Sequence, residues 1–387
     1  MKSDNYSYKV RLNVRFGFGI CRNIGEYLKK SGLNNVGFII DRGVFSSEPV
    51  KAMIKSAQDH CSVNKVYECS LVEPTYDELD AITEEFRNQK FDVIIGVGGG
   101  SIMDTAKGVC ALITNPGKGI QYRGFDLLKN NPIHMIAVPT TAGTGSEVTP
   151  NAVFTDSNEQ RKLGINGDKM FAYMSFLDPE LTMTCPKRPT VSSGMDAIVH
   201  TLESFGSIAA TPFSRMYSRE AFRLLFNSLP KLVDNMNDKD LRSKMLLGSH
   251  YAGIALFNAS AGPSGALSYP LGVLFKVPHG IAGAVFLPKV LRKNVEMGYY
   301  GYSELYDLID GANMSLSEKE KAFAFCDALD TLCNKVEIPD KLTVFGVTEN
   351  DIDILHKQTV TGLKAAIDHN PVKFEDKHIR EILENMI

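Results

Sequence analysis

Two side chains of types that can bind metal ions lie four residues apart in the second half of the chain. Asp196 and His200 belong to the segment GMDAIVH, whose apolar spacing predicts a helix, so both would project from one face. A third metal-binding side chain, His279, follows in the loop-like sequence VPHG. Three such groups can hold one divalent ion, whereas an Asp/His pair at this spacing can also be a surface hydrogen bond. The spacing alone leaves both interpretations open.

A run of glycines stands where a phosphate-binding turn is expected. Gly98, Gly99 and Gly100 follow the apolar run FDVIIG and precede Ser101, where a helix over residues 101–112 is predicted to begin. Backbone N–H groups at a helix N-terminus attract phosphate, and glycine lets the backbone approach a pyrophosphate closely. The pattern favours a nucleotide site, with a tight turn that binds nothing as the alternative.

Two more segments follow strand-like runs. Asp41 ends the run VGFII, and an acidic residue at the end of the second strand of a nucleotide-binding unit can bind a ribose hydroxyl and repel a 2′-phosphate. Asp41 therefore favours NAD over NADP, although an isolated aspartate is also a common turn residue. The segment PTTAGTGSE begins at Pro139, after the run IHMIAV. Because α/β folds bind ligands at the carboxyl edge of the sheet, this hydroxyl-rich loop is expected beside the glycines, unless it is an ordinary Ser/Thr-rich loop.

The elements that must position these side chains are of two kinds. Strands are predicted at residues 36–40, 91–96 and 133–138, and helices at 46–59 and 76–89 between the first two. This alternation predicts a parallel sheet covered by helices on both faces. From about Arg188 the spacing becomes helical, as at 214–227 and 318–335. We therefore expect an α/β domain over residues 1–185 and a helical domain over 186–387, with the prolines of CPKRP (185–189) interrupting helix and sheet at a hinge.

Composition excludes several classes of partner. The chain has 387 residues, 44% of them hydrophobic and 22% charged, and a formal net charge of −3, so neither nucleic acid nor a membrane surface is expected as a partner. No apolar run approaches the roughly 20 residues of a membrane span, and the N-terminal sequence MKSDNYSYKV does not look like a secretory signal. Seven scattered cysteines without a CxxC pair favour free thiols in the cytoplasm.

Several of these segments resemble one family, the iron-containing (group III) alcohol dehydrogenases, which are relatives of glycerol dehydrogenase and dehydroquinate synthase. The matching segments are GGGSIMDTAK (98–107), PTTAGTGSEVTP (139–150), LDPEL (177–181), GMDAIVHTLESF (194–205), ALSYPLG (266–272) and PHGIAGAVFLP (278–288). The resemblance spans essentially the whole chain, and PTTAGTGSEVT is very specific to the family. It implies a dehydroquinate synthase-like fold: an α/β Rossmann-like N-terminal domain and an all-helical C-terminal domain.

The resemblance also assigns the dinucleotide contacts to positions in this chain. It places the pyrophosphate loop at the three glycines and the serine after them, and the nicotinamide and ribose contacts at three threonines and one lysine. These residues are Gly98, Gly99, Gly100 and Ser101 with Asp104 nearby, then Thr140, Thr141, Thr144 and Lys162, and Asp41 as the residue that favours NAD. NAD is thus the expected cofactor, and NADP the less favoured one.

The metal site departs from the family pattern at one position. The resemblance assigns three of the four ligands to Asp196, His200 and His279, but the fourth, a histidine fourteen positions before His279, is Gly265 here. Tyr269 stands where many members of the family have a second active-site histidine. The predicted catalytic residues are Tyr269 and His279, and Tyr269 would act as a proton donor or acceptor. Three ligands plus water or substrate can form a catalytic site. A zinc or iron ion held by an incomplete ligand set and a site without metal both stay open.

The activity implied by the resemblance is NAD(P)-dependent interconversion of an alcohol and an aldehyde or ketone by hydride transfer. Expected substrates are small alcohols, aldehydes, hydroxy acids or sugar-derived hydroxyls, and a homodimer is expected because dimers are common in the family. One alternative, supported by Gly265, is a non-catalytic relative that binds nucleotide without metal-dependent activity. A second is a dehydroquinate synthase-like reaction, which needs basic and histidine residues that the sequence does not offer.

Overall fold

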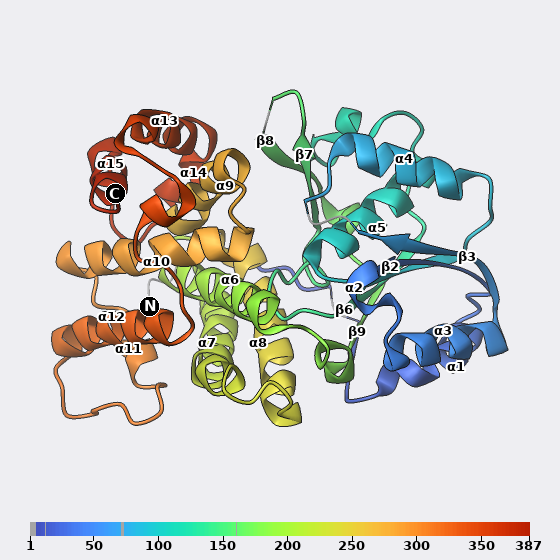
Figure 1. Cartoon of the computed structure of the whole chain (residues 1–387), viewed down its shortest axis with the longest axis horizontal. Coiled ribbons are helices and arrows are strands. Elements are labelled where there is room, and N and C mark those ends of the chain that lie inside the picture. The colour runs from blue at the N-terminus through green and yellow to red at the C-terminus, as the bar shows by residue number, and fades with distance from the viewer. Residues whose placement is uncertain (1–4, 12, 71–72, 160) are drawn as a thin grey trace. The chain divides into compact units, whose positions relative to one another are not determined.

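The chain divides into two units of different architecture, Arg11–Pro186 and Met1–Val10 with Lys187–Ile387 (Figure 1). The computed structural model describes residues 5–11, 13–70, 73–159 and 161–387. The first unit is built on a parallel sheet with helices, and the second is helical. The fold class predicted from the sequence is therefore confirmed.

The α/β unit contains a parallel sheet in the order β1-β9-β6-β4-β2-β3. Its strands are β1 (Val14–Phe16), β2 (Asn35–Asp41), β3 (Ser62–Cys69), β4 (Val93–Gly98), β6 (His134–Pro139) and β9 (Met174–Leu177). The three predicted strands correspond to β2, β4 and β6 at the centre of the sheet. These strands are apolar almost without interruption because both of their faces are buried.

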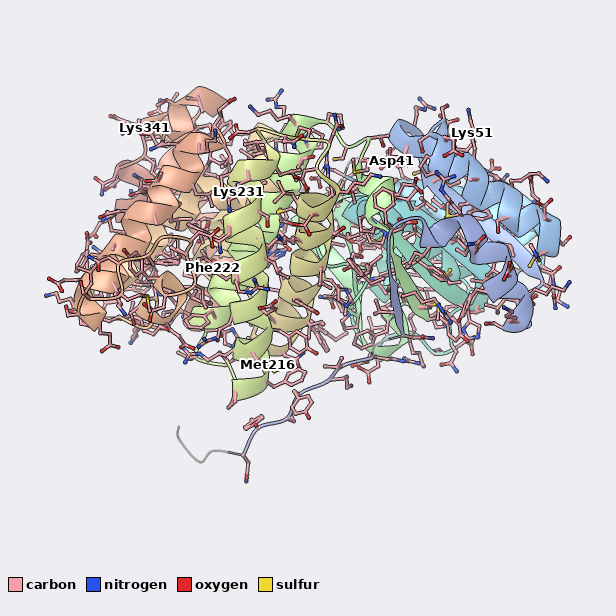
Figure 2. All side chains as sticks on the ribbon, turned by 90° about the horizontal axis from the view of Figure 1, so that it is seen from below. Asp41, Lys51, Met216, Phe222, Lys231 and Lys341 are labelled. Atoms are coloured by element: carbon pink, nitrogen blue, oxygen red, sulfur yellow. The ribbon has the colours of Figure 1, made fainter. Side chains whose placement is uncertain are left out.

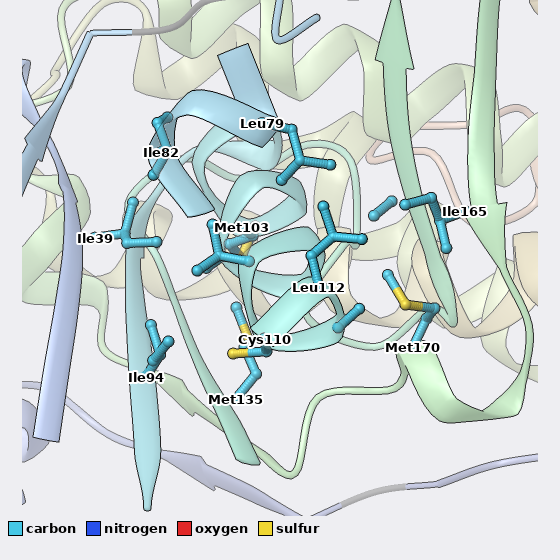
Figure 3. Packing of buried hydrophobic residues seen from close by; sticks show 14 of the residues in the cluster. Ile39, Leu79, Ile82, Ile94, Met103, Cys110, Leu112, Met135, Ile165 and Met170 are labelled. Atoms are coloured by element: carbon cyan, nitrogen blue, oxygen red, sulfur yellow. The ribbon is translucent and has the colours of Figure 1, made fainter. Parts of the chain in front are cut away.

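Helices cover the two faces of this sheet and form two separate cores. On one face α4 (Tyr76–Arg87) and α5 (Gly100–Thr114) pack over Ile39 and Ile94 (Figure 3). On the other face α1 (Ile24–Lys30) and α3 (Glu48–His60) pack over Phe38 and Ile95. Neighbouring residues of one strand thus enter different cores, as the two-residue repeat of a strand requires.

Shorter elements complete the α/β unit. A small sheet has the order β5-β8-β7, with β5 (Gly124–Phe125), β7 (Asn151–Asp156) and β8 (Arg161–Asn166). A short helix α2 (Arg42–Phe45) follows β2 directly. The 3-10 helices of this unit are Ile20–Asn23, Gly119–Tyr122, Asp168–Met170 and Pro179–Thr182.

The second unit is a helical assembly centred on α6 (Lys187–Gly206), which packs against α7, α8 and α10. The other helices are α7 (Pro212–Leu232), α8 (Lys239–Ala259), α9 (Pro263–Phe275), α10 (His279–Glu296), α11 (Ser303–Tyr306), α12 (Glu318–Lys335), α13 (Ile352–Gly362), α14 (Lys364–Asp368) and α15 (Asp376–Glu384), with 3-10 helices at Leu342–Phe345 and Glu349–Asp351. Phe222, labelled in Figure 2, lies in its core, and its ring lies against those of Phe226 and Phe325.

The proline-containing segment predicted as a hinge is only partly irregular. Helix α6 begins at Lys187, so Pro189 lies inside its first turn. Proline is tolerated there because the first N–H groups of a helix have no partner within it. The expectation that both prolines interrupt helix was therefore wrong for Pro189. Within the described part of the chain, no helix is long and apolar enough to cross a membrane.

Candidate functional site

The predicted nucleotide loops lie at one edge of the α/β sheet. Parallel pairing sets Ile40 beside Val97 and Gly98 beside Pro139, so the carboxyl ends of β2, β4 and β6 are neighbours. Helix α5 begins here with Gly99 as its N-cap residue. Glycine has no side chain to cap the helix, so the amides of the first turn can bind an anion. This arrangement suits a pyrophosphate.

The glycines also have a packing role that the sequence did not reveal. A Cβ atom on Gly100 would come within 2.7 Å of Thr144 Oγ1, and one on Gly99 within 3.3 Å of Thr141 Oγ1. The backbone N–H of Thr140 donates to Gly98 O at 3.0 Å. The glycine loop (residues 98–101) and the threonine loop (residues 139–147) are therefore packed directly against each other. A larger residue at position 100 would push the two loops apart.

Asp104 is buried behind these loops, where its carboxylate accepts hydrogen bonds from Ser146 Oγ at 2.5 Å and from the N–H of Val153 at 2.9 Å. Burial raises the pKa of this carboxyl. Both oxygens are thus bonded within the protein. The geometry favours a role for Asp104 in holding the threonine loop on α5 over the direct cofactor contact that the resemblance implied.

Lys107, one turn further along α5, also holds the loop from inside. Its Nζ donates to Ser146 Oγ, Thr149 O and Asn151 O at 2.7 to 3.0 Å. Burial lowers the pKa of Lys107 to about 8. The sequence analysis missed this residue because its partners are about 40 positions away in the chain, so no local spacing indicates them and only the fold shows them.

Asp41 and Lys162 already have partners in the α/β unit. Asp41 ends β2 (labelled in Figure 2), and its Oδ1 accepts from the N–H of Gly43 at 2.7 Å, which caps α2. Lys162 lies on β8 and forms an ion pair with Glu73. This capping hydrogen bond agrees with the alternative that Asp41 is a turn residue. The bond also leaves the negative charge of Asp41 at the end of β2, where it could still act on a cofactor.

The three predicted metal ligands come together within the helical unit. Helix α6 carries Asp196 and His200 one turn apart, and α10 begins at His279. A Cβ atom on Gly280 would lie 2.0 Å from Ser192 O, so only glycine lets the start of α10 approach α6 this closely. The loop expected at His279 is therefore the first turn of a helix, and Gly280 is the residue that allows the contact.

The geometry of this cluster fits a divalent ion. His200 Nε2 and His279 Nε2 lie 3.7 and 3.8 Å from Asp196 Oδ1, too far for hydrogen bonds. Two ligands that are each about 2.1 Å from one tetrahedral ion are about 3.4 Å apart, close to these separations. One ligand atom from each residue lies within 4.8 Å of the others, and no further His, Cys, Asp or Glu joins this group among the described residues. The donor set is that of a zinc or iron site.

Tyr269 lies next to this cluster on α9, and Gly265 lies one turn earlier on the same helix. The Tyr269 ring packs edge-on against the His279 ring, with centroids 5.3 Å apart and an interplanar angle of 80°. Gly265 lies in the first turn of α9, where a Cβ atom would come within 3.1 Å of Glu203 Oε2. The sequence analysis did not single out Glu203, although it stands three residues after His200 on the same helix.

The carboxyl edge of the parallel sheet and the Asp/His/His cluster fit a dehydrogenase that uses a dinucleotide and a metal ion, and comparison with known proteins identifies the family. The family model described as "Iron-containing alcohol dehydrogenase" matches residues 12–179, and the model "Fe-containing alcohol dehydrogenase family, C-terminal" matches residues 190–387. The chain therefore belongs to the iron-containing alcohol dehydrogenase family.

Individual relatives agree with this membership. Long-chain-alcohol dehydrogenase 1 of Geobacillus thermodenitrificans is 33% identical over 371 residues, which cover 95% of this chain and 93% of that protein. NAD-dependent methanol dehydrogenase of Bacillus methanolicus is 28% identical over 372 residues, 96% of this chain and 97% of the relative. Among solved structures, a 1,3-propanediol oxidoreductase superimposes with a TM-score of 0.92 at 29% identity and covers 99% of this chain and 100% of its own.

A second solved structure is relevant to the cofactor. Sulfoacetaldehyde reductase from Bifidobacterium kashiwanohense, determined in complex with NAD+, has a TM-score of 0.88 at 26% identity and covers 99% of each chain. These comparisons confirm the predicted family and enzyme class. The chain is an NAD(P)-dependent oxidoreductase that interconverts an alcohol and an aldehyde or ketone.

Proposed function

We propose that this enzyme works with one divalent metal ion held by Asp196, His200 and His279, without the fourth histidine of its relatives. The observation that carries the proposal is the cluster itself, in which the two imidazoles face one carboxylate oxygen at ligand-to-ligand distances. His200 faces Asp196 Oδ1 through its Nε2, so Nε2 is the atom that we propose meets the ion. Zinc is favoured over Fe²⁺ because affinity rises along that series.

Asp196, His200 and His279 would hold the ion that binds the substrate oxygen, and we propose that Tyr269 exchanges a proton with that oxygen. When bound, the divalent ion polarises that oxygen and the nicotinamide exchanges a hydride with the substrate carbon. Tyr269 is half-buried with its ring on the edge of His279, which restricts its phenol to a small range of positions. Such restriction makes proton transfer to or from a developing alkoxide effective.

The proposed dinucleotide site comprises the edge of the α/β sheet. Gly98, Gly99, Gly100 and Ser101 would hold the pyrophosphate at the start of α5, with Asp104 supporting them from behind. Thr140, Thr141, Thr144 and Lys162 would contact nicotinamide and ribose, and the charge of Asp41 would favour NAD over NADP. The relative determined with NAD+ supports this cofactor.

The relatives suggest the substrate class and the setting. Their names refer to long-chain alcohols, methanol, sulfoacetaldehyde and a hydroxyacid–oxoacid pair, so we propose a small alcohol, aldehyde, hydroxy acid or sugar-derived substrate. We also propose that residues 1–185 and 186–387 act as separate domains, and that the enzyme is a cytoplasmic homodimer. Its seven cysteines support a reducing compartment, since none forms a disulfide among the described residues.

Metal analysis of the purified protein and its His200→Ala variant tests the proposal. We expect about one zinc or iron ion per wild-type chain and its loss in the variant. The kcat/KM for NAD-linked alcohol oxidation should fall at least about 100-fold, since a Lewis acid supplies several kcal/mol of transition-state stabilisation. His356→Ala is the matched control, because His356 bonds to Asp376 O outside the cluster, and it should keep both metal and activity.

Three results would count against the proposal. Full turnover by metal-free wild-type protein would refute the proposal that the reaction needs a metal ion. Equal metal content in the wild-type protein and His200→Ala would refute the ligand assignment. Wild-type protein that binds NAD but oxidises none of a broad panel of alcohols would support the non-catalytic alternative that Gly265 suggested.

A further inference from the structure

Glu203 is a buried carboxylate on the helix that carries two of the proposed ligands. It stands seven residues after Asp196 and three after His200 on α6, so the three side chains share one face of that helix. The side chain is buried, with 6% of the residue exposed. No cationic side chain pairs with Glu203 in the part of the chain that the structure describes. A buried charge without a counter-ion is costly unless other donors stabilise it.

Those donors are the backbone amides at the start of α9. Gly262 N donates to Glu203 Oε2 at 2.8 Å and Ser264 N to Oε1 at 2.6 Å. Gly265 N reaches both oxygens, at 3.2 and 3.3 Å. Glu203 therefore caps α9 from another helix, and the partial positive charge of the helix N-terminus stabilises its carboxylate.

Two glycines leave the space that this carboxylate needs. A Cβ atom on Gly262 would lie 3.0 Å from Glu203 Oε1, and one on Gly265 would lie 3.1 Å from Oε2. Both distances are tighter than nine in ten real Cβ contacts, so a side chain at either position would require the carboxylate to move. Gly265 is thus more than a lost metal ligand, because it also lets the carboxylate approach the backbone of α9.

Helix α9 in turn contacts the third proposed ligand. One turn after Gly265, Ser268 Oγ donates to Gly265 O at 2.7 Å and lies 3.4 Å from His279 Nδ1. The next residue, Tyr269, packs its ring against the His279 ring. The position of α9 therefore sets how Ser268 and Tyr269 meet His279.

We infer that Glu203 is a positioning residue that joins α6, with Asp196 and His200, to the first turn of α9, and thereby sets the orientation of His279 and Tyr269. The inference rests on the proposed metal site. Glu203 is not one of the three proposed metal ligands. It acts on His279 and Tyr269 through the position of α9. Residues behind the ligands of a metal site commonly have this function, and their loss weakens metal binding by about 10- to 100-fold.

Glu203→Gln is the variant that tests this inference, because the amide has nearly the same shape. In glutamine an NH₂ group replaces one of the two carboxylate oxygens. This group is a donor and would face the backbone N–H donors at the start of α9, so the cap of that helix would be lost. Asp178→Asn is the matched control. Asp178 is also a buried carboxylate that accepts three backbone N–H bonds, from Gly19, Cys21 and Glu180, but it belongs to the α/β unit.

Two measurements are made on both full-length variants. Cobalt(II) titration of the metal-free protein gives the dissociation constant and the visible absorption bands, which report the geometry of the ligands. We expect Glu203→Gln to bind Co²⁺ about 10-fold more weakly or worse, with shifted bands. Hydrogen–deuterium exchange should be faster over residues 262–269. Asp178→Asn should keep the wild-type Co²⁺ constant and spectrum and the wild-type exchange over 262–269.

The outcomes separate the inference from the proposed metal site. Unchanged exchange over 262–269 in Glu203→Gln, or an unchanged Co²⁺ constant and spectrum, overturns the positioning role. Equal loss of Co²⁺ affinity in Asp178→Asn also overturns it, since the effect would then be general destabilisation. Failure of the wild-type protein to bind Co²⁺ refutes the metal site, and the inference with it, while the exchange data still report whether Glu203 anchors α9.

Discussion

At the scale of single residues, Asp41 combines two properties that one substitution separates. Its Oδ1 caps α2 through Gly43, and its charge stands at the carboxyl end of β2. Asparagine is as good an N-cap as aspartate, so Asp41→Asn keeps the cap and removes the charge. We expect the ratio of kcat/KM with NAD to that with NADP to fall about 10-fold, a free-energy change of about 1.4 kcal/mol, because a 2′-phosphate is no longer repelled.

Asp41→Ala provides the comparison for this prediction. It removes charge and cap together, so it should show the same change of cofactor preference and in addition lose about 0.5–2 kcal/mol of stability. Steady-state kinetics with both cofactors and thermal unfolding measure the two effects. A cofactor ratio in Asp41→Asn equal to that of the wild-type enzyme would show that Asp41 has only its capping role.

At the scale of elements, Lys107 joins α5 to the threonine loop. Its protonation equilibrium differs between the folded and unfolded states, so it makes stability depend on pH. Burial lowers the pKa of Lys107 to about 8, whereas a lysine in the unfolded chain has a pKa of about 10.4. Between these values the unfolded state binds more protons than the folded state. The contribution of Lys107 therefore makes the free energy of unfolding rise with pH across this window, by up to about 3 kcal/mol.

Lys107→Met removes this titration together with the three hydrogen bonds of Nζ. We expect the variant to be less stable than the wild-type protein, and we expect the difference to grow by about 1–3 kcal/mol between about pH 7.5 and pH 10. Urea unfolding at several pH values measures it. Lys51→Met, at an exposed position of α3 (Figure 2), is the control and should give a difference that does not change with pH. A constant difference for Lys107→Met would contradict the prediction.

At the scale of the whole molecule, the first residues of the chain belong with the last two hundred. Lys9 N donates to Asn258 Oδ1 at 2.8 Å, and Asn258 Nδ2 donates back to Lys9 O at 3.0 Å. The Tyr8 ring stacks on Phe213 with centroids 3.9 Å apart. The chain therefore passes between the two units twice, at Val10–Arg11 and at Pro186–Lys187.

Asn258→Ala removes both hydrogen bonds to Lys9. We expect the free energy of unfolding to fall by about 1–2 kcal/mol and deuterium exchange at residues 5–10 to become faster. Asn227→Ala, which loses side-chain bonds to Arg223 O and Leu308 O in the same unit, should lose stability without changing exchange at residues 5–10. Unchanged exchange at these residues in Asn258→Ala would show that this asparagine does not hold the N-terminal segment.

Much of the fold was predictable from local patterns. The runs that became β2, β4 and β6 are apolar because each is buried on both faces of the sheet, and α12 was predicted with both of its ends because its apolar residues recur at helical spacing. The edge strand β3 was not predicted. Its sequence SVNKVYEC mixes polar and apolar residues because only part of an edge strand is buried. Strand order could not be predicted either, since pairing depends on contacts between distant segments.

The sequence by itself determined the family and the enzyme class, because the residues that carry the resemblance occur in short segments with characteristic spacing, and from the same segments it predicted the residues for metal and dinucleotide. Only the tertiary structure decided what surrounds them. It showed that Gly100 makes room for the Thr144 side chain, that Gly280 lets α10 approach the backbone of α6, and that Gly265 lies against the carboxylate of Glu203. Such contacts join residues that are more than about 40 positions apart, and no local spacing rule encodes them.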